Sequence, residues 1–500
     1  MQGLVSQGML WCDVEDLFEY ARTQSRPSGI QRLTYEVYVA LQEVAGNEVG
    51  FVRQDPLAAT FRVVDWHEVK TLYARMGSAP LPPPAAREAP PGPIVPPALR
   101  VLARRVPDDV RFPLGQAVRA QIAAIRGVAQ ALHAVPRMAT ARQAVQSPVG
   151  VTEVAGRDLR DVARPGDVLA VLGSPWSHSN YAGMVARLSR TIGLRFALLV
   201  YDFIPAIRPE YCARQTVPAF VNFMRGCLPL ADLIFTISEA TARDVRRWAN
   251  QERIALRCPV RSVPIGAGFS HTQLATSLPE GLVPGGYAMF VSTIEARKNH
   301  QLAFRAWRRL LEDMPPAQVP ILVFVGRIGW MVSDLMQQIE NSSNLSGKLV
   351  LVNNADDATL AALYRGARFT LFPSLYEGWG LPVSESLAFG KVCLASNSSS
   401  VPEAGGSFCL YHDPDSVTEA ARLYRRVLDD PEMLLTLERR IVSDYEPIAW
   451  AATARAIYDA ILPGRDPSMA LHVPAPSNSG RHPATHARLG PDPGQAGPSD

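Results

Sequence analysis

The residues of this sequence that are best suited to chemistry are two acids, one in a glycine-containing loop and one in the predicted helix that follows the loop. Glu377 stands in the loop, and Glu385 follows eight positions later, in the first turns of a predicted helix. Gly378 and Gly380 let backbone N–H groups approach a ligand closely, because glycine has no side chain to keep it away. Pro382 suits the first turn of a helix, whose N-terminus offers free N–H groups and partial positive charge to an anion. The segment therefore predicts a site in which the two acids contact different parts of one extended, anionic ligand.

Short apolar strands alternate with helices along most of the chain, and these elements must position the loop. In the first half, strands are predicted at 9–14, 167–173, 196–202 and 233–238. In the second half, strands are predicted at 287–293, 321–326, 348–352, 369–373 and 392–396. Ser238 suits the N-cap of the helix that follows the fourth strand. Such alternation implies parallel sheets covered by helices on both faces, so the predicted fold class is α/β.

Two α/β domains are predicted, joined by a connection that contains Gly, Pro and Ser. The first spans 1–265 and the second 266–462, and a tail at 463–500 is too rich in Pro, Gly, Ser, Ala and His to form a core. The first domain carries an insertion at about 77–150. Its Pro-rich part is followed by 99–149, which has eight arginines and only two acids. Two interpretations of this basic part stay open: a helical insertion packed on the first domain, or a surface for an anionic membrane or a lipid diphosphate acceptor.

Composition and charge exclude some classes of protein. The 500 residues are 47% hydrophobic and carry a formal net charge of +3, which argues against a protein built mainly to coat nucleic acid. The six cysteines form no CxxC pair and no Cys/His cluster with zinc spacing, so we expect reduced thiols. No signal peptide is recognised, and no apolar run reaches the ~18 residues that span a bilayer. We expect a cytoplasmic protein, which the membrane interpretation of the insertion places at the inner face of the membrane.

The glycine loop resembles a known family. Residues 373–390 match the pattern PSxxEGxGLPxxExxAxG of the large family 4 of retaining glycosyltransferases, which have the GT-B fold. The resemblance implies two Rossmann-like domains with parallel sheets that face each other across a cleft. It also implies that Glu377 contacts the sugar of a nucleotide diphosphate sugar and that Glu385 bonds the ribose hydroxyls. The backbone groups implied to bind the sugar and the diphosphate are those of Gly378, Trp379, Gly380 and Leu381.

Two neighbouring cations also match the family. Residues 291–300 resemble the turn GTxExRKN at the start of the second domain, and Lys298 matches the lysine that holds the donor diphosphate. A leaving nucleoside diphosphate gathers negative charge on a phosphate oxygen, which fixed cations stabilise. The family's more usual glycine-arginine pair is replaced here by Ser292 and Thr293. We therefore assign the second positive charge to Arg297.

Weaker matches add further candidate binding residues. Gly326 lies in a segment that resembles the family's GxxGW turn, where it allows the nucleotide to approach, and Trp330 is read either as core packing or as stacking on the base. Gly29 lies in a segment that resembles a TGIQR turn, before a helix on the acceptor side. Asp202 follows Tyr201, which replaces the usual histidine of an HDxIP strand end, and is the candidate contact to the sugar or the acceptor.

No metal site is predicted. Asp413 and Asp415 have the Asp-x-Asp spacing that holds a divalent ion in many other glycosyltransferases, but they precede a helix start and are read as turn and capping residues. The resemblance implies that the acceptor hydroxyl attacks the anomeric carbon on the face that the diphosphate leaves, with no protein nucleophile. The nucleotide diphosphate sugar is then a co-substrate, and no further cofactor is expected.

The predicted function is transfer of a hexose to a glycan or lipid-linked acceptor in surface polysaccharide assembly. A nucleotide-sugar-binding protein without turnover and a nucleotide-sugar epimerase of the same architecture stay open as alternatives. A dinucleotide oxidoreductase is disfavoured, because no Gly-x-Gly-x-x-Gly turn follows an N-terminal strand. The sequence leaves the base, the sugar and the acceptor open.

Overall fold

The computed structural model describes residues 8–24, 26–78, 154–176, 178, 180–268, 277–353 and 355–461. The basic segment 99–149 and the tail 463–500 lie outside these ranges, as does most of the Pro-rich part of the insertion. Within the described ranges, no helix combines the length and the apolar character that crossing a membrane requires.

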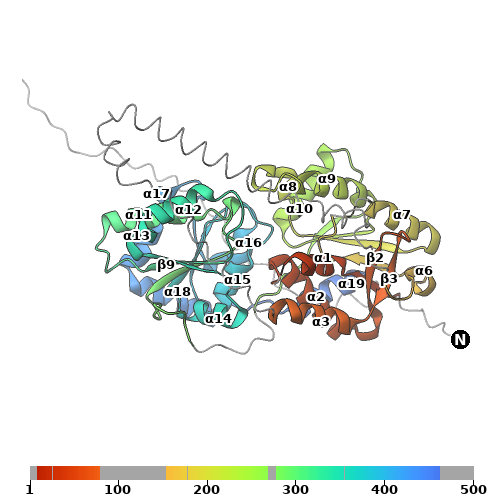
Figure 1. Cartoon of the computed structure of the whole chain (residues 1–500), viewed down its shortest axis with the longest axis horizontal. Coiled ribbons are helices and arrows are strands. Elements are labelled where there is room, and N and C mark those ends of the chain that lie inside the picture. Colours follow the sequence, from red (N-terminus) through yellow and green to blue (C-terminus); the bar gives the residue numbers. More distant parts are fainter. Residues whose placement is uncertain are drawn as a thin grey trace, which may run out of the picture. The chain divides into compact units, whose positions relative to one another are not determined.

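The described strands of the first half form a seven-stranded sheet with the order β3-β2-β1-β4-β5-β6-β7 (Figure 1). These strands are β1 (Leu10–Asp13), β2 (Val49–Asp55), β3 (Thr60–Val64), β4 (Val168–Val171), β5 (Arg195–Val200), β6 (Leu233–Thr236) and β7 (Val260–Ser262). β1 pairs in parallel with β2 and β4, and β6 pairs in parallel with β5 and β7. β3 is antiparallel to β2, with Val64 opposite Phe51.

The described strands of the second half form a six-stranded sheet with the order β10-β9-β8-β11-β12-β13, and all of its pairings are parallel. Its strands are β8 (Tyr287–Val291), β9 (Ile321–Val325), β10 (Leu349–Val352), β11 (Phe369–Phe372), β12 (Cys393–Ser396) and β13 (Leu410–His412). Parallel neighbours need a crossover connection, and here helices provide it.

The helices follow the same alternation. Those of the first half are α1 (Glu15–Thr23), α2 (Gly29–Ala45), α3 (Trp66–Ser78), α6 (Leu159–Val162), α7 (Tyr181–Ile192), α8 (Ile204–Ile207), α9 (Thr216–Cys227) and α10 (Glu239–Gln251). Those of the second half are α11 (His300–Asp313), α12 (Ser333–Asn341), α13 (Ser343–Gly347), α14 (Asp357–Gly366), α15 (Leu381–Ala388), α16 (Val401–Gly405), α17 (Val417–Asp429), α18 (Pro431–Asp444) and α19 (Trp450–Ile461). Residues 344–346 of α13 have left-handed backbone angles.

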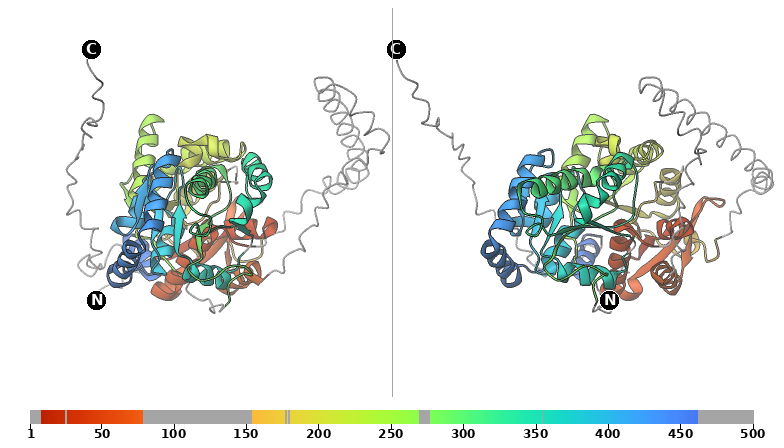
Figure 2. Two further views of the ribbon diagram at one scale, coloured as in Figure 1. Left: turned by 90° about the vertical axis from the view of Figure 1, so that its left-hand side faces the viewer. Right: turned by 60° about the vertical axis from the view of Figure 1, so that its left-hand side comes forward.

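Alternate residues of β8 point to opposite faces of the second sheet, as the pleat of a strand requires. Ala288 and Phe290 belong to a core that includes residues of α11, whereas Tyr287 and Met289 belong to a second core with residues of α14. Figure 1 shows α11, α12 and α17 on one side of this sheet and α14 on the other, and Figure 2 shows the same part, coloured green to blue, from two further directions. Burial on both faces explains why these strands are nearly continuous apolar runs.

The structure confirms the α/β class and two sheets, of which the second is parallel throughout and the first contains one antiparallel strand, β3, at its edge. Each of the nine predicted strands is present, with ends that differ by at most two residues. Four strands were not predicted: β2, β3, β7 and β13. Arg53, Gln54 and Arg62 interrupt the apolar pattern of β2 and β3, and β7 and β13 are only three residues long.

Contacts divide the described residues into two compact units. One lies within Gly8–Tyr35 and Asn47–Phe196, and the other lies within Glu36–Gly46 and the chain from Ala197 onward. All of the second sheet, together with α8, α9 and α10, belongs to the latter unit. The domain limits predicted from the sequence, 1–265, 266–462 and 463–500, stay predictions.

Candidate functional site

The candidate site is built on residues 373–380, which connect β11 to α15 and are called the acidic loop below. Gly380 has a φ of +130°, a backbone conformation that side chains disfavour, and it stands directly before α15. A Cβ atom at Gly378 would lie 2.0 Å from the carbonyl oxygen of Tyr201, so only glycine fits there. Pro382 occupies the first turn of α15, as predicted. Both loop glycines therefore have a steric reason, and the close approach at Gly378 is to the protein's own backbone.

Glu377 is buried between two cations. Its carboxylate lies 2.6 Å from Lys298 Nζ and 2.8 Å from Arg297 Nη1. Burial by itself raises the pKa of Glu377, but the charges and hydrogen bonds of Arg297 and Lys298 outweigh burial and lower the pKa to about 2. The side chain is therefore ionised at neutral pH. The structure thus brings together the three residues that the sequence predicted to act on the donor.

Arg297 holds more than one partner in place. Its Nη2 donates to Glu295 Oε1 at 2.8 Å, and its Nη1 donates to the carbonyl oxygen of Tyr376 at 2.7 Å. Burial disfavours its charge, but Glu377 and Glu295 favour it more strongly and raise the pKa of Arg297. Glu295 was not predicted as a site residue, although it is the glutamate of the GTxExRKN turn and that signal was available.

Asp202 lies close enough to Glu377, Arg297 and Lys298 for their charges to affect it. Its pKa is raised, mainly by burial, while the nearby Arg297 and Lys298 lower it and Glu377 raises it. Its Oδ1 accepts a hydrogen bond from the backbone N–H of Ile204 at 3.0 Å, at the start of α8. The contact of Asp202 with the sugar or the acceptor stays a prediction.

Glu385 lies inside α15 and is also buried. The Tyr364 hydroxyl donates to its Oε2 at 2.8 Å, which fixes the carboxylate from α14. Trp379 donates from its indole N–H to Ser384 Oγ at 3.2 Å, and Leu381 is the first residue of α15. The nucleotide-binding roles of these residues stay predictions.

Gly326 supports the turn that carries the cations. It has a φ of +149°, and a Cβ atom there would lie 2.0 Å from the carbonyl oxygen of Ser292. The segment after Gly326 also contacts the turn that carries the cations, because the N–H of Gly329 donates to the carbonyl of Ile294 at 2.8 Å. The close approach at Gly326 is thus to the backbone just before the cations, and contact with a nucleotide stays a prediction.

Gly29 and Trp330, the candidates from two other glycine-containing turns, have different surroundings. Gly29 is the first residue of α2 in the other compact unit, and a Cβ atom there would meet nothing within 4 Å. Trp330 is 42% exposed and donates its indole N–H to the carbonyl of Tyr211 at 2.9 Å. The core-packing interpretation of Trp330 is therefore wrong, because the side chain lies at the surface beside the short segment Pro209–Tyr211.

His300 is the first residue of α11, immediately after the turn that carries the cations. It is buried and stacked on Phe290, with ring centroids 4.1 Å apart. Burial, with a smaller effect of Lys298, lowers its pKa to about 3. The imidazole is neutral at physiological pH and acts as packing.

The Asp-x-Asp pair lies in a turn, as predicted. The N–H of Asp415 donates to Asp413 Oδ1 at 2.8 Å, and Ser416 then caps α17. Across the described ranges, no group of three or more His, Cys, Asp and Glu side chains has an arrangement that could hold a metal ion.

Sequence comparisons identify proteins that are similar to this chain. The family model of the glycosyl transferases group 1 matches residues 284–441. The O-antigen chain mannosyltransferase B of Escherichia coli is 30% identical over 227 residues, which cover 44% of this chain and 58% of that protein. The serotype-specific mannosyltransferase WbdA of Escherichia coli is 27% identical over 208 residues, which cover 39% of this chain and 25% of that protein. The chain thus spans about half or less of the length of these curated relatives.

Among solved structures, a UDP-forming trehalose-phosphate synthase from Burkholderia xenovorans aligns with a TM-score of 0.47 and 15% identity, covering 61% of this chain and 75% of that one. Residues 284–441 of the chain are thus similar to the glycosyl transferases group 1 family. The matched region contains Glu377, Glu385, Lys298 and Arg297, so the family resemblance predicted from those residues is confirmed.

Proposed function

We propose that this protein is a retaining glycosyltransferase that moves a hexose from a nucleotide diphosphate sugar to a glycan or lipid-linked acceptor. The observation that carries the proposal is the ionised Glu377 held between Lys298 and Arg297, directly before the N-terminus of α15. Because the relatives named above are mannosyltransferases and one acts on an O-antigen chain, mannose is the first sugar to test and surface polysaccharide the first acceptor class.

In the proposed reaction, the acceptor hydroxyl oxygen forms a bond to the anomeric carbon on the face that the diphosphate leaves. The bond between that carbon and the phosphate oxygen breaks, and its electron pair stays on the phosphate oxygen, which takes the acceptor's proton. The products are the glycosylated acceptor and a nucleoside diphosphate. No protein nucleophile, metal ion or further cofactor takes part in this scheme.

Lys298 stabilises the charge that develops on the leaving phosphate. An ammonium group has three donor hydrogens, so Lys298 can bond a phosphate oxygen and Glu377 together. The N-terminus of α15 adds backbone N–H groups and a partial positive charge to the same diphosphate. Removal of one such preorganised donor typically costs a factor of about 10²–10³ in rate.

Glu377 acts as a hydrogen-bond acceptor for sugar hydroxyls in this scheme. Its pKa of about 2 keeps it ionised through the neutral range, so it carries no proton to give to a leaving group. Glu385, which is fixed by Tyr364, accepts hydrogen bonds from the ribose hydroxyls in this scheme. The two acids thus divide the donor between them, as the sequence interpretation proposed.

A panel of donors tests the proposal. The whole chain is heated with GDP-mannose, UDP-glucose, dTDP-glucose or ADP-glucose, because a donor that binds the folded state raises its stability, and a tighter donor raises it more. The stabilising donor is then incubated with and without a mannan or lipid-linked acceptor, and nucleoside diphosphate release and the anomeric configuration of the product are measured. Acceptor-dependent release with retained configuration supports the proposal. Binding without turnover supports a binding protein, and conversion of the donor without an acceptor supports an epimerase.

The same panel, repeated with and without EDTA, tests metal independence, because the proposed scheme gives equal rates in both.

The basic segment 99–149, which lies outside the described residues, is proposed as a peripheral contact to the inner face of the membrane. Sedimentation with phosphatidylglycerol vesicles, compared with neutral phosphatidylcholine vesicles, tests this contact, and equal sedimentation with both would contradict it.

A further inference from the structure

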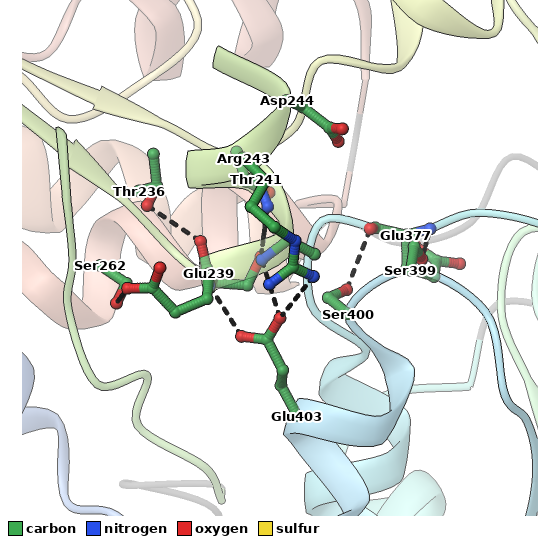
Figure 3. A network of polar contacts seen from close by, with 12 residues as sticks. Thr236, Glu239, Thr241, Arg243, Asp244, Ser262, Glu377, Ser399, Ser400 and Glu403 are labelled. Atoms are coloured by element: carbon green, nitrogen blue, oxygen red, sulfur yellow. Dashed lines mark hydrogen bonds and ion pairs between the residues drawn. The ribbon is translucent and has the colours of Figure 1, made fainter. Parts of the chain in front are cut away.

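The first turn of α10 is capped by a residue that lies far away in the sequence. The backbone N–H groups of Glu239 and Ala240 donate to the two carboxylate oxygens of Glu403, each at 2.7 Å (Figure 3). The following N–H group, that of Thr241, donates to Ser238 Oγ at 3.0 Å. Because the first N–H groups of a helix have no partner within the helix, Glu403 satisfies two donors that would otherwise bond water.

The capping interaction has favourable electrostatics. A carboxylate at a helix N-terminus interacts with the positive end of the helix dipole, and hydrogen bonds to a charged acceptor are stronger than neutral ones. Arg243 adds an ion pair with Glu403 at 3.7 Å. In a capping box, a glutamate three residues after the N-cap reaches back to the N–H of the N-cap residue, but α10 has Thr241 at that position. Glu403, from α16, instead binds the N–H groups of the two residues that follow the N-cap.

Glu403 is connected to the acidic loop through the serine turn, residues 398–400, which directly precedes α16. Ser399 Oγ accepts the N–H of Glu377 at 2.8 Å. The Ser400 hydroxyl donates to the carbonyl oxygens of Glu377 and Trp379, both at 2.9 Å. Both backbone groups of Glu377 are therefore bonded by the serine turn. Ser399 has a φ of +51°, which few residues other than glycine adopt, so its conformation is imposed by its surroundings.

The acidic loop is also held by α10 itself. The Tyr376 hydroxyl donates to Asp244 Oδ2 at 2.7 Å. The Thr241 hydroxyl lies 3.4 Å from the carbonyl oxygen of Gly378. The loop therefore has contacts with both α10 and the serine turn. Figure 3 shows that Glu403, which follows the serine turn, contacts the start of α10, so it joins these two supports to each other.

We propose that Glu403 is a positioning residue for Glu377. Its carboxylate fixes the start of α10 against α16, and this contact keeps the serine turn and α10 in the one arrangement that presents Glu377 to the donor sugar. The kinetic consequence rests on the proposed function, whereas the structural consequence does not. Loss of the carboxylate should loosen Glu377 without removing any group that touches the donor.

Hydrogen exchange measures the structural consequence in the full chain. In Glu403→Gln, which keeps the size of the side chain but has only one acceptor oxygen, we expect the Glu239 and Ala240 amides to exchange about tenfold faster or more, the factor expected for loss of a charged hydrogen bond. The Glu377 amide should also exchange faster. Glu403→Asp, which is shorter but keeps the charge, should give an intermediate result.

Glu419→Gln is the matched control, because Glu419 is also an exposed acid that accepts a backbone N–H at a helix start, that of Asp413 before α17. It should leave the exchange of Glu239, Ala240 and Glu377 unchanged. Faster exchange in α10 with an unchanged Glu377 amide would overturn the proposal, because the cap would then be local to α10. Unchanged exchange at all three amides would overturn it as well.

Kinetics supply the second measurement. If the donor panel identifies an active donor, Glu403→Gln should lower kcat by about tenfold to a hundredfold, as misplacement of a reacting group does, with the donor KM changed by less than about twofold. An unchanged kcat with faster Glu377 exchange would overturn the positioning role. Failure of the wild-type chain to transfer any sugar would contradict the proposed function alone, since the exchange measurements decide on Glu403 without turnover.

Discussion

Two places where the described residues bury carboxylates can be compared, because their surroundings give the carboxylates different charges. Beside Lys298 and Arg297, the pKa of Glu377 is lowered to about 2. At the end of β1 and just after it, in the other compact unit, burial raises the pKa of Asp13 to about 6 and that of Asp16 to about 7. Burial is similar in the two places, so burial alone does not decide the charge.

The difference lies in the partners. Asp13 accepts hydrogen bonds from neutral donors, which include Gln54 Nε2 and the Tyr181 hydroxyl at 2.8 Å and the backbone N–H of Glu15 at 3.0 Å. Arg53, which lies in the same region, instead pairs with Glu15 through two hydrogen bonds. Two cations in direct contact lower the pKa of Glu377 despite its burial, whereas the single guanidinium of Arg53 leaves the pKa of Glu15 raised and neutral donors leave that of Asp13 raised. The pair of cations therefore distinguishes the surroundings of Glu377 from those of the acids around Asp13.

The largest expected effect comes from removing a cation. Lys298→Ala should lower kcat by about 10²–10³, because it removes a fixed donor from the leaving phosphate. The donor dissociation constant should change far less. Steady-state kinetics with the identified donor check this, and Arg308→Ala, which removes an exposed cation of α11, serves as the control. Equal losses in the two variants would show that Lys298 has no special role.

Glu385 should affect affinity more than rate. Glu385→Ala should weaken nucleotide binding by about tenfold or more, since a hydrogen bond to a charged group is lost. Calorimetric titration with the nucleoside diphosphate measures this directly. Tyr364→Phe removes only the hydroxyl that orients Glu385 and should give a smaller loss. Nucleotide binding that is unaffected in both variants would remove Glu385 from the site.

Arg297 should set the charge of Glu377. The folded-state pKa of Glu377 lies below its usual value, so the ionised form persists until the pH falls to about 2. In Arg297→Met the pKa should rise, and the acid limb of the kcat/KM profile should move to higher pH. Arg297→Lys keeps a positive charge and should move it less. A profile of the same shape in all three proteins would contradict the assignment.

Ionisation of Asp16 should lower the stability of the fold, in contrast to the ionisation of Glu377, which its surroundings favour. Its folded-state pKa is raised above the usual value, so it stabilises the fold most below pH 3.8, and this contribution is lost as the pH rises towards about 7. Asp16→Asn cannot ionise, so its Tm should exceed that of the wild type near pH 8 by roughly 2–4 °C for each kcal/mol gained. The gain should shrink towards pH 4. The exposed Asp429→Asn serves as the control, and a gain that does not depend on pH would contradict the role of ionisation.

The sequence predicted the fold where one simple pattern dominated. The strands of the second sheet are short, apolar runs bounded by turns, so all of them but β13 were predicted. The site residues were predicted because the loop glycines, the two glutamates and the cations lie in motifs with fixed spacing. β2 and β3 were not predicted because charged residues at their surface break the apolar run.

The supports of the site could not be predicted in the same way. Glu403 lies 164 residues from Glu239, and Ser399 lies 22 residues from Glu377, whose N–H it binds. A serine or a glutamate is common at the surface, and no spacing marks the one that meets a distant backbone group. Only the fold shows which of these polar side chains are partners.

Gly378 has a practical consequence for anyone who redesigns this protein. Because its Cα faces the Tyr201 carbonyl with no room for a methyl group, a saturation library at position 378 should return glycine alone. Position 29, which has open space around it, should tolerate small substitutions. Changes of sugar preference must therefore be sought in the side chains around the acidic loop, with its backbone kept as a fixed point.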